Sequence, residues 1–117
     1  MKLSEIRDIL KAEVLTGAEQ MDKIIVAGGG ADIMDAVLSA VAHDAVVLTG
    51  LTDESVVRTA KIAGVGAVVF VRGKRPAPKV VEQARQFALP LLLTDFSMFV
   101  SIGKLYMNGL RGLDGSW

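Results

Sequence analysis

Three apolar segments begin at Ala45, Ala67 and Leu89, each 22 residues after the previous one. Each segment is followed by a polar loop and an amphipathic stretch, and the spacing leaves room for one strand and one helix per unit. Consecutive strand–helix units give parallel strands joined by right-handed crossovers. The spacing therefore predicts an α/β fold, a three-layer α/β/α sandwich around a mostly parallel sheet of four or five strands.

The other segments add elements before and between these units. The three strands of the repeated units are expected at 44–50, 66–73 and 89–95. Two further strands are expected before them, at 12–17 and 23–27. Apolar residues recur at helical spacing within 3–11, 31–44, 51–64, 76–88 and 97–109. The expected caps are Thr52 or Asp53 and Gly64 for the 51–64 helix, Pro76 and Pro78 at the entry of the next helix, and Thr94 or Asp95 for the last helix.

The chain of 117 residues is long enough for one domain with its own core and too short for two. We expect a single domain over residues 1–112 and a flexible tail over 113–117. Hydrophobic residues make up 51% of the chain and aromatic residues only 5%, so the core is aliphatic. This composition suits a parallel sheet buried on both faces, and its excess of apolar residues favours a homodimer that covers part of the surface.

The balance of 13 basic and 13 acidic residues gives the chain no general attraction to nucleic acid or to an anionic membrane. Cysteine is absent, which excludes disulfides and thiolate chemistry. The N-terminal residues carry charges throughout, and no apolar run reaches the about 20 residues of a membrane span. We expect a cytoplasmic protein that binds neither nucleic acid nor membrane.

Ligands of open parallel sheets bind beyond the carboxyl ends of the strands. Here four loops follow predicted strands, with the sequences AGGGAD, TGLTDES, VRGKRPAP and TDFSMF. Several of these loops begin helices, whose N-termini favour anions. The sequence therefore places any binding site in these loops.

Gly28, Gly29 and Gly30 have two interpretations. Their bare backbone would let a ligand approach closely, but the run fails both the dinucleotide pattern and the P-loop pattern, and Asp32 would repel a phosphate. In the other interpretation the glycines form a tight strand-to-helix turn with positive φ.

The loop containing Arg72, Gly73 and Lys74 is the best anion candidate. Guanidinium and ammonium groups follow a buried strand there, although a solvated basic loop would have the same composition. Thr49 and Gly50 precede the cap of the next helix, so they can also face a ligand. With the three glycines, these residues form the predicted ligand site.

Catalytic motifs are weak in this sequence. His43 is the only histidine and has no neighbouring nucleophile in the chain, and Ser97 lacks the G-x-S-x-G frame. No pair of His, Asp or Glu has metal-ligand spacing. We expect neither an enzyme nor a bound cofactor or metal.

The last helix has a wide apolar face, with a glycine at position 103. Packing on the sheet explains this face, and so does a seam between two copies of the chain. Its apolar residues are Met98, Phe99, Ile102, Leu105, Tyr106 and Leu110.

The run VVLTGLTDESVVRTAKIAG, followed by VVFVRGKRPAPKVVEQARQFALPLLLTDFSMFVSIGKLY, resembles a stand-alone DRTGG domain. The similarity extends over roughly residues 1 to 112. Such domains are similar to the middle domain of long phosphotransacetylases and to the N-terminal domain of HPr kinase/phosphorylase. The resemblance implies an α/β/α sandwich in a bacterial or archaeal cytoplasm, of a kind that often accompanies nucleotide-binding CBS domains.

The chain departs from that family in its chemistry. It has no P-loop, so the kinase activity attributed to some members does not transfer. TGLTDE stands in place of the Gly-Asp-Arg turn of many members, and VRGK in place of Thr-Gly-Gly. The sequence favours a non-enzymatic regulatory domain that binds a small anionic metabolite or nucleotide. The alternative is a protein-interaction module for a metabolic enzyme or sensor kinase.

Overall fold

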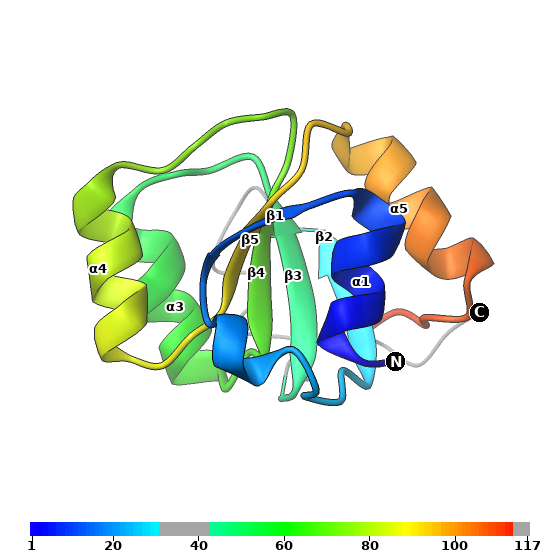
Figure 1. The fold of residues 1–117 in the computed structure, drawn as a ribbon, viewed down its shortest axis with the longest axis horizontal. Helices are drawn as coiled ribbons and strands as arrows, with labels where there is room; N and C mark the ends of the chain where they lie inside the picture. The colour runs from blue at the N-terminus through cyan, green and yellow to red at the C-terminus, as the bar shows by residue number, and fades with distance from the viewer. Residues whose placement is uncertain (31–42, 114–117) are drawn as a thin grey trace.

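A computed structural model describes residues 1–30 and 43–113 (Figure 1). The helix predicted after the three glycines and the end of the predicted tail lie outside the described residues. In chain order the elements are α1 (Leu3–Leu10), β1 (Glu13–Thr16), the 3-10 turn η1 (Ala18–Gln20), β2 (Ala27–Gly30), β3 (Ala45–Thr49), α3 (Glu54–Ala63), β4 (Ala67–Phe70), α4 (Pro78–Gln86), β5 (Leu91–Leu93) and α5 (Met98–Met107).

The five strands form one sheet in the order β1-β5-β4-β3-β2. Strands β2 to β5 are parallel, and β1 joins the outer edge of β5 in the antiparallel direction. Helices α3 and α4 cover one face of the sheet, and α1 and α5 cover the other (Figure 1). The predicted three-layer α/β/α sandwich with a mostly parallel sheet is confirmed.

The core consists of two apolar clusters, one on each face of the sheet. Alternate residues of a strand point to opposite faces, so Val47 packs beneath α3 and α4, whereas Val46 and Leu48 pack beneath α1 and α5. All five residues of β3 are buried. Within the described part of the chain, no helix is long and apolar enough to cross a membrane.

Local sequence signals set several helix ends as predicted. Asp53 caps α3 by accepting a hydrogen bond from the Ser55 amide at 3.0 Å, and Gly64 ends the helix with a φ of 73°. Pro78 is the first residue of α4.

The predicted cap of the last helix was wrong. Ser97 caps α5, because its hydroxyl accepts a hydrogen bond from the Val100 amide at 3.2 Å. Thr94 has a different role: its buried hydroxyl donates to the Leu10 carbonyl at 2.8 Å and thereby holds the end of α1 against the sheet.

The predicted glycine turn was also wrong. Gly28, Gly29 and Gly30 lie inside β2, none has a positive φ, and they pair with the three central residues of β3, Val46, Val47 and Leu48. These glycines allow close packing on the edge strand. A Cβ atom at Gly28 would lie 2.8 Å from Leu110 Cδ2, and one at Gly29 would lie 2.7 Å from Leu113 Cδ1.

The C-terminal segment closes over this edge strand. The Gly28 amide donates to the Arg111 carbonyl at 2.8 Å, and Gly28 forms an isolated parallel bridge with Gly112. Leu110 is buried against α1 and the sheet. Residues 110–113 are therefore packed onto β2.

Candidate functional site

A cavity of about 200 Å³ lies where β3 and β4 end and α5 begins. The loops that leave the carboxyl ends of the parallel strands gather at the upper end of the molecule in Figure 1. We call this space the strand-end cavity. Its lining residues are Gly50, Val71, Arg72, Ser97, Met98 and Phe99.

Arg72 reaches this cavity from a tight turn. The Lys74 amide donates to the Val71 carbonyl at 3.2 Å, and φ is 58° at Arg72 and 66° at Gly73, the pattern of a type I′ turn. Gly73 adopts this conformation easily, but for Arg72 it costs roughly 1–2 kcal/mol.

The neighbouring loop holds the turn in place. The Arg72 amide donates to the Phe96 carbonyl at 2.8 Å, and the Gly73 amide donates to the Thr94 carbonyl at 2.9 Å. Because these amides are already bonded, an anion in the cavity would meet the Arg72 side chain rather than the backbone of the turn. A bulky residue held at positive φ beside a cavity is a reason to look for function there.

The N-terminus of α5 adds positive potential to the cavity. Ser97 caps this helix of ten residues, and its first turn contains no acidic residue. By contrast, Glu5 and Glu54 lie in the first turns of α1 and α3. The partial positive charge of the α5 terminus is therefore not offset by a side chain of its own first turn.

The cations near the site differ in their partners. Among the described residues, Arg72 and Lys74 form no ion pair. Arg75 makes a bidentate contact with Glu13, with N–O distances of 3.0 and 2.6 Å. These hydrogen bonds lower the pKa of Glu13 and raise the pKa of Arg75. Arg75 is therefore paired with Glu13 of β1, whereas Arg72 lines the cavity.

Two wider surface grooves run beside α3 and α4, but their charges are balanced. Lys79 lies 3.3 Å from Glu54, and Arg58 lies 3.7 Å from the same carboxylate. Arg85 pairs with Glu82 in the second groove. The cations of both grooves therefore already have carboxylate partners.

The predicted site residues fall in different places. Gly50 and Arg72 line the strand-end cavity together. Thr49 is completely buried below it, where its hydroxyl oxygen accepts a hydrogen bond from the Leu51 amide at 3.1 Å. Gly73 shapes the turn, and Lys74 is exposed beside it without lining the cavity.

The three glycines of β2 lie next to this site rather than in it. Gly28 and Gly29 line a separate cavity of about 70 Å³ beneath α5, whose other walls are mostly apolar. A Cβ atom at Gly30 would lie 2.7 Å from the sulfur of Met98, and Met98 lines the strand-end cavity. The missing side chain at Gly30 therefore leaves room for Met98, which forms part of the cavity wall.

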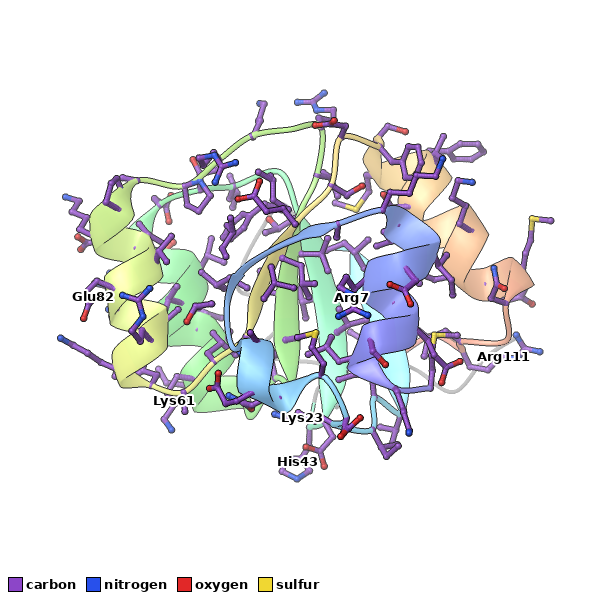
Figure 2. The ribbon with its side chains drawn as sticks, in the orientation of Figure 1. Arg7, Lys23, His43, Lys61, Glu82 and Arg111 are labelled. Atoms are coloured by element: carbon purple, nitrogen blue, oxygen red, sulfur yellow. The ribbon has the colours of Figure 1, made fainter. Side chains whose placement is uncertain are left out.

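Four residues of this cavity, Val71, Ser97, Met98 and Phe99, were not among those predicted. Val71 follows β4 directly, Ser97 caps α5 after β5, and Met98 and Phe99 are the first two residues of α5. That common position after a strand is the signal that identifies them. His43 lies at the opposite end of the molecule, before β3 (Figure 2). In the described part of the chain, no three His, Cys, Asp or Glu side chains form a metal-binding group.

The family model of the DRTGG domain matches residues 5–106. The chain belongs to the DRTGG domain family. The resemblance carried by its sequence motifs is thereby confirmed. No curated protein sequence matches the chain significantly.

A solved structure shares the fold of this DRTGG domain. It contains the CBS and DRTGG domains of the regulatory region of Clostridium perfringens pyrophosphatase, complexed with its activator, diadenosine tetraphosphate. The TM-score is 0.75 at 15% sequence identity, and the match covers 99% of this chain. Because it covers 50% of the other chain, this chain spans half the length of the structure that it matches.

Proposed function

We propose that this DRTGG domain is a non-enzymatic regulatory domain that binds a small anionic metabolite or nucleotide in the strand-end cavity. It acts as a homodimer in the cytoplasm. The position of Arg72 carries the proposal, because this residue is held in a left-handed conformation beside a helix N-terminus that lacks an acidic residue in its first turn.

The two positive groups complement each other. The guanidinium offers a planar fork to a phosphate or carboxylate, and the first amides of α5 offer further donors. Ser97 and Gly50 line the same space without adding charge. A phosphate or carboxylate group is the kind of ligand that this combination favours.

The size of the cavity restricts the part of the ligand that it holds. Pockets that enclose a drug-sized molecule have roughly 300–1,000 Å³, and this one has about 200 Å³. One anionic group fits inside, and the rest of the molecule extends over the rim. Phe99 lies on that rim with 88% of its surface exposed, so its ring is available to a nucleotide base.

The comparison structure supports a nucleotide as the ligand class. Its regulatory region binds a dinucleoside polyphosphate activator, and the DRTGG fold is part of that region. A regulatory role for this chain agrees with its family and with the regulatory region that shares its fold.

A protein-interaction module is the second candidate function. The exposed apolar side chains of α5, Phe99 and Met107 above all, favour it. Under this hypothesis the domain binds a metabolic enzyme or sensor kinase without a small ligand, and Arg72 has no role in binding.

A thermal-shift screen with two matched variants tests the proposal. The probes are diadenosine tetraphosphate, ATP, an acyl phosphate and a sugar phosphate. A ligand at a hundredfold excess over its Kd stabilises the fold by about 2.7 kcal/mol. We expect Arg72→Ala to lose this stabilisation and Arg75→Ala to keep it, because Arg75 is paired with Glu13. A screen without stabilisation would favour the interaction module, and equal stabilisation of both variants by a ligand would contradict its binding at Arg72.

A further inference from the structure

Among the residues that the structure describes, none gives a structural reason for glycine at position 103. Gly103 lies in the middle of α5, where glycine is less favourable than alanine. A Cβ atom at this position would meet no heavy atom within 4 Å in the structure as described, and its φ is not positive. Neither packing nor backbone conformation in the described chain therefore requires glycine at this position.

The residues around Gly103 form an exposed apolar surface. Phe99, Gly103 and Met107 are spaced by four residues, so they lie on one side of α5, with Ile102 and Tyr106 next to them. Phe99 is 88% exposed and Met107 is 87% exposed. We call these five residues the α5 face, and α5 lies on the outside of the molecule (Figure 1).

We propose that the α5 face is a self-association surface at which two copies of the chain cross at Gly103. The missing side chain leaves a hollow between Phe99 and Met107, and two crossing helices can approach closely there. A contact about a twofold axis places the same surface on both copies, so the hollow of each copy accepts a side chain of the other.

The area and charge of the α5 face suit a weak dimer. Its side chains present on the order of 500 Å² of apolar surface per copy. Standard interfaces bury about 800 Å² per copy, so the dimer is expected in the micromolar range or weaker. The face contains no carboxylate, and its neighbouring cations rest on rings of their own chain: Lys104 lies 4.9 Å from the Phe96 ring and Arg111 lies 5.0 Å from the Tyr106 ring.

This surface meets the strand-end cavity at Phe99, which belongs to both. A second copy of the chain therefore orders a side chain that also borders the ligand. Once either the ligand or the second copy of the chain has ordered Phe99, binding of the other partner costs less conformational entropy. Resting on the proposed function, this coupling predicts that ligand and self-association strengthen each other by roughly two- to tenfold.

Sedimentation velocity over a concentration series tests the surface. Wild-type protein is expected to shift from monomer toward dimer as its concentration rises. Gly103→Lys adds a charge at the centre of the α5 face and improves helix propensity, so it should fold and remain monomeric. Met107→Lys is a second disrupting variant. Ile62→Lys is the matched control, because Ile62 is also exposed, at 76%, but lies on α3.

The outcomes separate this inference from the proposed function. Self-association through the α5 face would be refuted if the wild type stayed monomeric at all concentrations. It would also be refuted if Gly103→Lys and Met107→Lys associated as strongly as Ile62→Lys. Saturating diadenosine tetraphosphate should tighten the wild-type dimer, whereas Arg72→Ala should dimerise without responding to it. An unchanged or weaker dimer in the nucleotide would refute the coupling. If no nucleotide bound, the nucleotide form of the proposed function and the coupling to nucleotide would fail together, and the variants would still decide self-association.

Discussion

Alanine at Gly28 should destabilise the fold, whereas alanine at Gly103 should stabilise it. A Cβ atom at Gly28 would lie 2.8 Å from Leu110 Cδ2 and 3.1 Å from Val46 Cγ1. Leu110 is buried, and Val46 is a β-branched residue of the central sheet, so neither can move away easily. Overpacking of this kind costs typically about 1–3 kcal/mol.

Two effects of the same substitution must be combined. Replacing glycine by alanine restricts the unfolded chain, which stabilises the fold by roughly 0.4–1 kcal/mol. The net destabilisation of Gly28→Ala is therefore about 1–2 kcal/mol, or a decrease in Tm of roughly 4–8 °C. Gly103→Ala meets no steric obstacle in the described structure and should gain about 0.5–1 kcal/mol.

Urea unfolding followed by circular dichroism measures both free energies, at a protein concentration where the chain is monomeric. The two variants carry the same chemical change, so the comparison isolates the environment of each glycine. If Gly28→Ala were as stable as the wild type, the close approach of Leu110 to β2 could not be the reason for glycine at this position.

Three further predictions concern the loops and the pH dependence. Gly73→Ala should lose about 1–2 kcal/mol in urea unfolding, because φ is 66° there and the new Cβ would lie 3.0 Å from Asp95 Oδ1; an unchanged stability would contradict the turn. Asp53→Ala should lose about 1 kcal/mol with its cap, while Asp53→Asn should lose less; equal losses would point to charge rather than capping. The hydrogen bonds from Arg75 lower the pKa of Glu13 from its usual value of 4.5, so their contribution is present above that value and disappears as the pH falls through the folded-state pKa. Unfolding of wild type and Glu13→Gln at pH 7 and pH 3 should show a larger difference at pH 7 than at pH 3, and a larger difference at pH 3 would refute the pairing.

The order and type of the elements could be predicted because the signals are local. The 22-residue spacing, the Asp53 and Gly64 caps and the position of Pro78 each depend on a few neighbouring residues. The predicted start of the last strand was wrong. Strand β5 begins at Leu91 rather than Leu89, because the Leu89 amide still donates a hydrogen bond to the Ala84 carbonyl of α4.

Long-range contacts explain what the sequence could not predict. The three glycines of β2 look like a turn because the residues that need their space come from the other end of the chain. In the same way, Thr94 was expected to cap α5, but its hydroxyl bonds to the carbonyl of Leu10, 84 residues away. The order of the strands in the sheet could not be predicted either, because it also depends on contacts between residues far apart in the sequence.

The candidate site was predicted as a region but not in its details. The rule that ligands bind at the carboxyl ends of parallel strands selected the loops of Gly50 and Arg72, and the structure brings these two residues to the same cavity. The rule could not separate Arg72 from Lys74, which is exposed beside the cavity without lining it. Nor could it show that the Arg72 amide is bonded to Phe96 and that only its side chain is available.

An anion bound in the strand-end cavity can be located by NMR. A titration of the ¹⁵N-labelled chain with diadenosine tetraphosphate reports on each backbone amide. The largest shifts should fall on Gly50, Arg72 and the first turn of α5, with Gly28 and the α4 residues nearly unchanged. Shifts centred on the grooves beside α3 and α4, or no shifts at all, would contradict binding in this cavity.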